Sequence, residues 1–271
     1  MEERKRIHFV GIGGAGMSAI AVVLLARGMR VSGSDLKESR NTRRLRQMGA
    51  SIRIGHRADN VEGADILVVS SAISERNQEL VRARELGLQV LPRASMLGLI
   101  MAESKGIAVA GIHGKTTTTS MIAMIMREAG LDPTYVIGGE LNDVGSNAHA
   151  GSGEFAIAEA DESDGSFLLL RPWAEVITNV EEDHLDFFRD GEEIRDYFRR
   201  FVSLLPRDGV LLGLADSGAH VSQLCDACFA TDLLGPWVRD KQVMSLERAQ
   251  MMFGLEDRDE SHGLTGAIRD P

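Results

Sequence analysis

A glycine-rich turn at residues 111–118, with the sequence GIHGKTTT, constrains the possible folds of this chain more than any other segment. It follows an apolar run at 107–110 that predicts a buried strand, and it precedes a helix expected at 117–129, which Gly130 would end. Between a strand and a helix, glycines allow backbone N–H groups to face an anion at the helix N-terminus. The pattern therefore predicts an α/β unit with a phosphate-binding loop.

Two side chains in this turn have the chemistry of a nucleotide site. Lys115 would contact the outer phosphates of a bound nucleotide, and the hydroxyl of Thr116 would bind Mg²⁺. The usual spacing of such a loop places a further glycine at position 109, where this chain has Val109. The turn is thus a shortened variant of the common phosphate-binding loop. A turn without a ligand is the alternative, but it leaves Lys-Thr at a helix start unexplained.

A second glycine-rich turn lies near the start of the chain. Residues 11–16 match the pattern G-x-G-x-x-G after a short apolar strand at 7–10, and the helix expected at 18–27 ends before Gly28. The next strand is predicted at 29–32, and Asp35 lies near the position where a Rossmann unit binds a ribose hydroxyl. This motif alone leaves two interpretations open, a nucleotide site or a tight turn without a ligand.

Composition limits the class of protein. A chain of 271 residues with 44% hydrophobic and 26% charged residues has room for two globular domains. The net charge of −10 argues against a nucleic-acid surface, and no apolar run is long enough to span a bilayer, so we expect small-molecule partners and neither nucleic acid nor a membrane. The two cysteines cannot form a secreted disulfide framework, which favours a reducing compartment, the cytoplasm.

Strands and helices alternate in the first part of the chain. Apolar strands are expected at 66–69 and 88–91, with a helix at 77–86 between them that Gly87 ends. After Pro92, residues 93–105 are interpreted as a connection to a second unit. We place the domain boundary near Glu103, so that residues 1–103 form a Rossmann-like domain.

The second unit, residues 104–211, is predicted to be a P-loop-type ATP-binding domain. Further strands are expected at 155–158 and 176–178, so both units belong to the α/β class with mainly parallel sheets. A helix at 194–205 repeats apolar side chains at helical spacing, which predicts a stripe that faces the core. The members of this stripe are Ile194, Tyr197, Phe198, Phe201, Leu204 and Leu205.

Acidic side chains follow one strand of the second unit, at the edge where open α/β sheets bind their ligands. Glu159 is the first charged residue after the buried run at 155–158, which is the position of a metal-binding carboxylate in nucleotide-binding folds. Asp161, Glu162 and Asp164 come next. Some of these three belong only to a solvated loop, and the sequence does not decide which of them contacts a ligand.

A histidine lies in the corresponding position after another strand. His184 follows the strand at 176–178 and is surrounded by the carboxylates of residues 181–186. Histidines in such a place are either ligands or structural residues, and both interpretations stay open.

Four segments together resemble the Mur ligases. They are GIGGAGMS at 11–18, GIHGKTTTT at 111–119, EADESD at 159–164 and TNVEEDHLD at 178–186. The first is the most discriminating, whereas the Gly-Lys-Thr-Thr loop is shared with related folate and cyanophycin ligases. The resemblance covers about residues 5–210.

The resemblance implies ATP-dependent formation of an amide bond in peptidoglycan precursor synthesis. It is strongest to members that use ATP to convert the lactyl carboxylate of UDP-N-acetylmuramate to an acyl phosphate. The amine of L-alanine then attacks this intermediate, and the products include ADP and phosphate. One glycine loop would hold the diphosphate of the substrate and the other would hold the nucleotide.

The resemblance also implies roles for single residues. The catalytic residues are Lys115, Glu159 and His184, where Lys115 stabilises the transferring phosphoryl group. Thr116 and Glu159 would bind a first Mg²⁺ and His184 a second. The implied nucleotide-binding residues are Gly111, Ile112, His113, Gly114, Lys115, Thr116, Thr117 and Asn179, the last near the ATP base. The implied substrate-binding residues are Gly11, Gly13, Gly14, Gly16, Met17, Ser18, Asp35, His56, Ser70 and Ser71.

The end of the chain departs from the family pattern. Mur ligases continue into a third domain that closes over the site, and we expect residues 212–271 to be a tail without family resemblance, such as a truncated or frameshifted reading frame produces. Cys225 and Cys228 form half a zinc-site pattern, but His220 and His262 lack the spacing to complete it. We therefore expect no zinc site.

Two other functions stay open. A nicotinamide-dependent oxidoreductase would account for residues 11–16 and Asp35, but it leaves Lys115 and Glu159 unexplained. A non-catalytic fragment that binds nucleotide or UDP-sugar keeps every motif. Such a fragment would bind UDP-N-acetylmuramate or Mg-ATP without alanine-dependent release of ADP, because acyl transfer requires exclusion of water and alignment of the amine.

Overall fold

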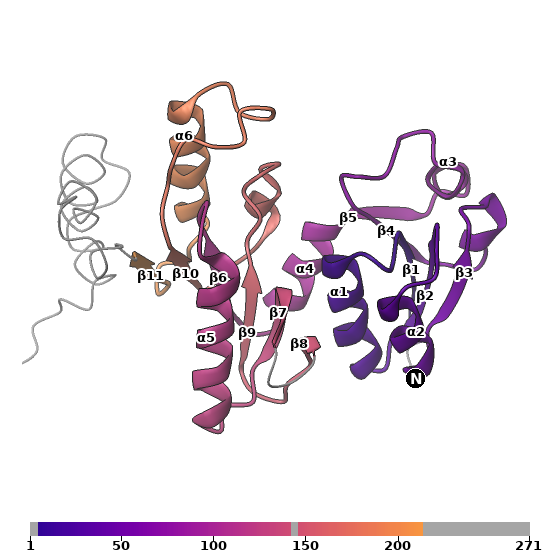
Figure 1. Cartoon of the computed structure of the whole chain (residues 1–271), viewed down its shortest axis with the longest axis horizontal. Helices are drawn as coiled ribbons and strands as arrows, with labels where there is room; N and C mark the ends of the chain where they lie inside the picture. The colour runs from indigo at the N-terminus through magenta and orange to yellow at the C-terminus, as the bar shows by residue number, and fades with distance from the viewer. Residues whose placement is uncertain (1–4, 142–145, 214–271) are drawn as a thin grey trace, which may run out of the picture.

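The computed structural model describes residues 5–141 and 146–213, which form two α/β units (Figure 1). The first unit has a five-stranded parallel sheet with the order β3-β2-β1-β4-β5. Its strands are β1 (Arg6–Val10), β2 (Arg30–Asp35), β3 (Ser51–Ile54), β4 (Ile66–Val69) and β5 (Gln89–Pro92). This order is that of a Rossmann fold, as predicted.

Helices cover both faces of the first sheet because neighbouring residues of its strands point to opposite sides. Phe9 belongs to the cluster that includes α1 (Ala15–Ala26), and Leu45 of α2 (Arg40–Gln47) lies in the same cluster. Val10 packs on the other face, with side chains of α3 (Gln78–Glu85) and of the short 3-10 helix η1 (Ala58–Val61). The glycine loop after β1 therefore begins at the carboxyl end of the central strand.

The second unit has a six-stranded sheet with the order β11-β10-β6-β9-β7-β8. All strand pairs are parallel except β7 with β8. The strands are β6 (Lys105–Ala110), β7 (Thr134–Leu141), β8 (Ser146–His149), β9 (Phe155–Glu159), β10 (Ala174–Ile177) and β11 (Val210–Gly213). The predicted class, α/β with mainly parallel sheets, is confirmed for both units.

One helix on each face completes the core of the second unit. On one face, Ala123 of α5 (Lys115–Glu128) packs against Tyr135 and Ile157. On the other face, α6 (Gly191–Val202) buries Ile194, Phe198 and Phe201, and Phe167 of the short 3-10 helix η2 (Ser166–Leu169) stacks on Phe201. The predicted stripe is confirmed for these three residues of α6, and the half-buried Tyr197 packs against the same core cluster.

Two details of the α6 prediction are wrong. The helix ends at Val202, so Leu204 lies beyond it and is 37% exposed, whereas Leu205 is buried in the core cluster. The helix starts three residues earlier than expected because Asp190 accepts a hydrogen bond from the backbone N–H of Glu193, which caps the first turn.

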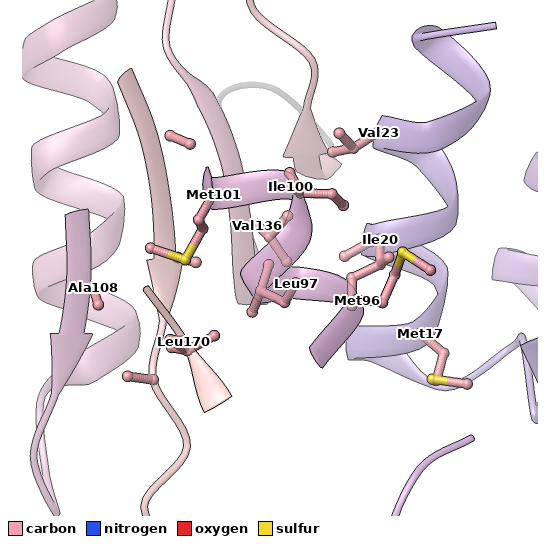
Figure 2. Packing of buried hydrophobic residues seen from close by; sticks show 14 of the residues in the cluster. Met17, Ile20, Val23, Met96, Leu97, Ile100, Met101, Ala108, Val136 and Leu170 are labelled. Atoms are coloured by element: carbon pink, nitrogen blue, oxygen red, sulfur yellow. The ribbon is translucent and has the colours of Figure 1, made fainter. Parts of the chain in front are cut away.

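The connection predicted after Pro92 contains a helix, α4 (Arg93–Ala102). Figure 2 shows Leu97, Ile100 and Met101 of α4 among core side chains from both units. Gly98 allows the close approach, because a Cβ at this position would lie 2.7 Å from the carbonyl oxygen of Leu169. Helix α4 thus packs against strands of both sheets, and α1 of the first unit contacts β7 and β8 of the second. The two units therefore share one hydrophobic core.

Several predicted features lie outside the described residues. These are the tail from residue 214 onward and its four possible zinc ligands, Cys225, Cys228, His220 and His262. Of the helices in residues 5–141 and 146–213, none is long and apolar enough to cross a membrane.

Candidate functional site

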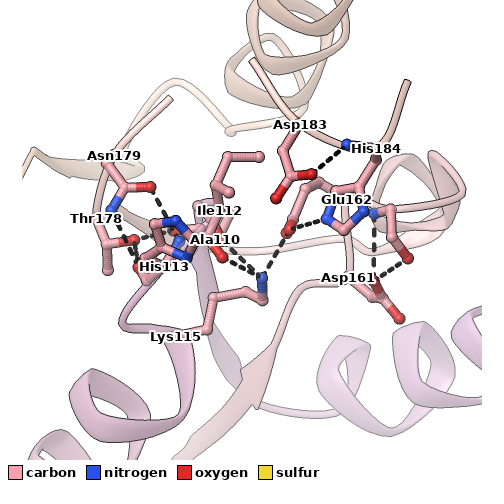
Figure 3. Close-up of polar contacts among 12 residues, drawn as sticks. Ala110, Ile112, His113, Lys115, Asp161, Glu162, Thr178, Asn179, Asp183 and His184 are labelled. Carbon is pink, nitrogen blue, oxygen red and sulfur yellow. Dashed lines mark hydrogen bonds and ion pairs between the residues drawn. The ribbon is translucent and has the colours of Figure 1, made fainter. Parts of the chain in front are cut away.

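The glycine loop at 111–114 is held by side chains that follow β10, the strand next to β6 (Figure 3). The amide of Asn179 accepts a hydrogen bond from the N–H of His113 at 3.0 Å and donates one to its carbonyl oxygen at 3.2 Å. The hydroxyl of Thr178 lies 3.2 Å from the carbonyl oxygen of Ala110 and 2.5 Å from that of His113. Asn179, expected near the ATP base, therefore supports the backbone of the loop in this structure.

Glycine is required at two positions of this loop. Gly111 has φ +131°, and a Cβ there would lie 2.0 Å from the Thr178 hydroxyl oxygen. Gly114 has φ +81° and occupies the N-cap of α5. The loop consequently turns directly into the helix, which leaves the N–H groups of the first turn of α5 for an anion.

Lys115, the first residue of α5, folds back over the loop. Its ammonium group lies 2.7 Å from the carbonyl oxygen of Gly111 and 2.7 Å from Oε1 of Glu162. The Glu162 side chain is 1% exposed, and its Oε2 has no hydrogen-bond partner within the described part of the chain. Of the three acidic residues that the sequence left open, Glu162 is the one placed against Lys115.

His184 lies on the other side of the same carboxylate. Its Nε2 is 3.5 Å from Oε1 of Glu162, and its backbone has φ +53°, a left-handed conformation that is uncommon for a residue with a side chain. The backbone N–H of His184 donates a hydrogen bond to Oδ1 of Asp183 at 2.7 Å. Glu162 thus connects the predicted phosphate-binding lysine with the predicted metal-binding histidine, a role that the sequence did not reveal.

Glu159 ends β9 and faces a cavity between the two units. Its Oε1 accepts a hydrogen bond from the N–H of Gly138 at 2.8 Å. This inter-unit cavity has a volume of about 260 Å³, and the residues that line it include Gly16, Arg93, Lys115 and Glu159. Residues from both glycine loops therefore meet in one cavity.

The predicted metal ligands are not gathered into one cluster. Thr116 is exposed in the first turn of α5, Glu159 faces the inter-unit cavity, and His184 contacts Glu162. In the described ranges, no group of three or more His, Cys, Asp or Glu side chains is arranged to hold a metal ion. The assignment of Thr116, Glu159 and His184 as metal ligands therefore stays a prediction.

Hydrogen bonds connect the first glycine loop to the carboxyl end of β2. The N–H groups of Gly11 and Ile12 donate to the carbonyl oxygen of Ser34, and the N–H of Gly13 donates to Oδ2 of Asp35 at 2.8 Å. Asp35, expected to face the uridine side, is thus engaged with the loop itself. The N–H groups that remain for an anion are those of the first turn of α1, which includes Gly16.

Other predicted substrate residues differ in their surroundings. Met17 and Ser18 are buried in α1, and the Ser18 hydroxyl donates to the carbonyl oxygen of Ala15 at 3.0 Å. Their side chains belong to the interior, as Figure 2 shows for Met17. The backbone N–H of Ser18 donates to the carbonyl oxygen of Gly14 at 2.8 Å.

His56 is anchored to a buried polar cluster. Its Nδ1 lies 2.9 Å from the Ser34 hydroxyl and 3.1 Å from Oε2 of Glu79, which is fully buried. Burial acts to raise the pKa of Glu79, but hydrogen bonds from His8, Ser34 and Asn60 outweigh it and leave the pKa below its usual value. This cluster connects β2 with α3, because the Ser34 hydroxyl donates a hydrogen bond to Glu79.

Ser70 and Ser71 line a second cavity, of about 480 Å³, beyond the carboxyl ends of β4 and β5. Arg93, the first residue of α4, lines this cavity as well as the inter-unit cavity. Its Nη2 lies 2.8 Å from Oδ2 of Asp161. Burial acts to raise the pKa of Asp161, but hydrogen bonds from Ser163 and Arg93 bring it below the usual value. The sequence analysis did not single out Arg93.

Comparison with known proteins assigns both units to one family. A model of the Mur ligase family, catalytic domain, matches residues 6–105, and a model of the Mur ligase middle domain matches residues 109–225. The chain belongs to the Mur ligase family. The second match continues past Leu212, where we expected the resemblance to end, and family membership argues against a nicotinamide-dependent oxidoreductase.

Curated relatives of this Mur ligase chain include two UDP-N-acetylmuramate–L-alanine ligases. The protein from Geotalea daltonii is 55% identical over 214 residues, which are 79% of this chain and 47% of the relative. The protein from Pelotomaculum thermopropionicum is 52% identical over 216 residues, 80% of this chain and 47% of the relative. The chain spans about half the length of these relatives.

Solved Mur ligase structures have the same fold. The UDP-N-acetylmuramate-alanine ligase of Thermotoga maritima has a TM-score of 0.70 and 32% identity, and the match covers 78% of this chain and 49% of that one. The UDP-N-acetylmuramate:L-alanyl-gamma-D-glutamyl-meso-diaminopimelate ligase of Neisseria meningitides has a TM-score of 0.73 and 28% identity, with 83% and 75% covered.

Proposed function

We propose that this chain contains the substrate-binding and ATP-binding domains of a ligase that joins L-alanine to UDP-N-acetylmuramate. The observation that carries the proposal is the inter-unit cavity, which Gly16 of the first unit lines together with Lys115 and Glu159 of the second. A ligase that activates a carboxylate must bring this carboxylate to the terminal phosphate of ATP. A cavity shared by two phosphate-binding loops meets that requirement.

Lys115 would stabilise the phosphoryl group during transfer. Its ammonium group now contacts Glu162 and the carbonyl oxygen of Gly111. Phosphate oxygens at the N-terminus of α5 would supply a stronger negative charge, supported by the N–H groups of the same turn. The lactyl carboxylate would then attack the γ-phosphorus, and ADP would leave.

The residues present fit Mg²⁺. Glu159 uses one carboxylate oxygen for the N–H of Gly138, which leaves the other for a cation, and Thr116 offers a hydroxyl beside Lys115. Mg²⁺ is usually bound by one or two protein carboxylates together with nucleotide phosphates, so a larger protein cluster is not required. We propose Thr116 and Glu159 as ligands of a first Mg²⁺ and His184 as a ligand of a second, and these ions would neutralise charge on the phosphate oxygens.

The second half of the proposed reaction forms the amide bond. The amine of L-alanine attacks the carbonyl carbon of the acyl phosphate, phosphate leaves with the electron pair of the broken C–O bond, and the amine loses a proton. Because the substrates include ATP and a UDP-activated sugar, we propose the cytoplasm as the place of this reaction.

Calorimetric titration of the 271-residue chain tests the proposal. We expect Mg-ATP and UDP-N-acetylmuramate each to bind, and Lys115→Met to lower the affinity for Mg-ATP by tenfold or more, about the effect of one charge-assisted contact. Lys105→Met is the matched control, because Lys105 is exposed and pairs with Glu154 away from the loop. Equal Mg-ATP affinity in the parent chain and Lys115→Met would contradict the assignment.

A further inference from the structure

Arg93 lies where two cavities of the described residues adjoin. It begins α4, the helix that packs against both sheets, and it lines both the cavity of Ser70 and Ser71 and the cavity of Lys115 and Glu159. Any molecule that extends from one cavity into the other passes this guanidinium group.

The side chain of Arg93 also lies directly over the first glycine loop. A Cβ at Gly16 would be 2.5 Å from Nη1 of Arg93 and 3.3 Å from its Cδ. The absence of a side chain at Gly16 thus lets the guanidinium approach the first turn of α1. This is the turn whose N–H groups remain available to an anion.

The guanidinium keeps donors for a ligand. Nη2 is bonded to Oδ2 of Asp161 at 2.8 Å, whereas a guanidinium has five N–H donors. The Arg93 side chain is 32% exposed, and Asp161 fixes it from the second unit. A planar group with donors in a fixed fork binds phosphate oxygens with defined geometry.

We propose that Arg93 binds the diphosphate of the sugar nucleotide across the first glycine loop, with Asp161 as its positioning residue. The inference rests on the proposed function, because it takes UDP-N-acetylmuramate as the ligand. It adds a cation from α4 to a site otherwise made of backbone N–H groups, and it couples the substrate site to the loop that follows Glu159.

Calorimetric titration with UDP, UDP-N-acetylmuramate and Mg-ATP tests the proposal. Arg93→Gln should weaken UDP and UDP-N-acetylmuramate equally, by about tenfold or more, because each has the diphosphate. The affinity for Mg-ATP should stay that of the parent chain, which also shows that the variant is folded. Arg82→Gln is the control, because Arg82 forms an exposed ion pair with Glu85 on α3.

Asp161→Asn separates positioning from general loss of structure. We expect a smaller loss of UDP affinity than in Arg93→Gln, and no further loss when both changes are combined, since Asp161 acts through Arg93. Unchanged UDP affinity in Arg93→Gln, or a loss confined to UDP-N-acetylmuramate, would overturn the assignment to the diphosphate. If the parent chain binds neither UDP nor UDP-N-acetylmuramate, the proposed function fails together with this inference.

Discussion

The ammonium group of Lys115 lies 2.7 Å from Oε1 of Glu162, so the lysine of the nucleotide loop has a buried carboxylate as its counter-ion. Removing one partner of such a pair leaves an uncompensated charge, which is strongly destabilising. A bound nucleotide would offer phosphate oxygens to the same lysine. The pair therefore links the stability of the second unit to occupation of its proposed site.

Glu162→Gln should lower stability in the absence of nucleotide, by about 3 kcal/mol, because Lys115 loses its charged partner. Mg-ATP should raise the melting temperature of this variant more than that of the parent chain, since phosphates then supply the missing charge. Differential scanning fluorimetry measures both effects. Glu154→Gln, which breaks an exposed pair with Lys105, should change stability by about 1 kcal/mol or less, and the same small change in Glu162→Gln would contradict the prediction.

Asn179 and Asn41 offer reciprocal tests of the two loops. Asn179 bonds both backbone groups of His113, whereas the Asn41 amide donates to the carbonyl oxygen of Gly13 at 2.9 Å. With about 1 kcal/mol for each of its two hydrogen bonds, Asn179→Ala should weaken Mg-ATP binding by up to about thirtyfold and spare UDP-N-acetylmuramate. Asn41→Ala should have the opposite selectivity. Calorimetry in which both variants affect both ligands alike would show that the loops are not independent.

The lowered pKa of Asp132 predicts that the folded chain loses stability in acid. The backbone N–H of Ser152, then the side chains of His149 and Ser152, donate hydrogen bonds that lower the pKa of Asp132 to about 2. This stabilisation is present above the ordinary value of 3.8 and is lost as the pH falls from there through about 2. Asp132→Asn should remove this pH dependence while tolerating φ +39°. Urea unfolding between pH 2 and 5 compares the two, and parallel curves would refute the prediction.

The sequence predicted the elements that begin or end at glycines and have apolar runs, but it missed elements without these signals. α2 has the sequence RNTRRLRQ, in which Leu45 is the one buried apolar residue, so no hydrophobic period is visible. Its start is marked only by the reciprocal hydrogen bonds of Ser39 and Thr42. The segment at 93–102, predicted only as a connection between the units, has apolar residues at helical spacing and forms α4.

The site could be predicted as two loops, but its internal contacts could not. Asp161, Glu162 and Asp164 are equivalent in the sequence, and only the turn in which the N–H of Gly165 bonds to the carbonyl oxygen of Glu162 directs one of them to Lys115. Arg93 meets Asp161 across 68 positions of the chain, and such a pair has no local signal. The ligand contact that the spacing of Asp35 indicates stays a prediction, and its hydrogen bond from the N–H of Gly13 could not be inferred from spacing alone.

The buried carboxyl group of Glu175 predicts that the substitution Glu175→Gln increases the free energy of unfolding. This residue of β10 is fully buried, and neither carboxylate oxygen has a hydrogen-bond partner among residues 5–141 and 146–213. Burial raises the pKa of Glu175 well above its ordinary value of 4.5. The folded chain therefore holds the proton more tightly than the unfolded chain does.

The sign of the pH dependence follows from this difference. The contribution of Glu175 to stability is fully present below pH 4.5, and it is lost as the pH rises from there through the raised pKa of the folded state, by up to about 1.4 kcal/mol per pH unit. Glu175→Gln has no proton to lose, so its stability advantage over the parent chain should be larger at pH 7.5 than at pH 4.5. Glu128→Gln, at the exposed end of α5, should show no such trend. Urea unfolding at the two pH values measures the difference, and an equal difference at both would mean that Glu175 is charged and solvated or paired in the folded chain.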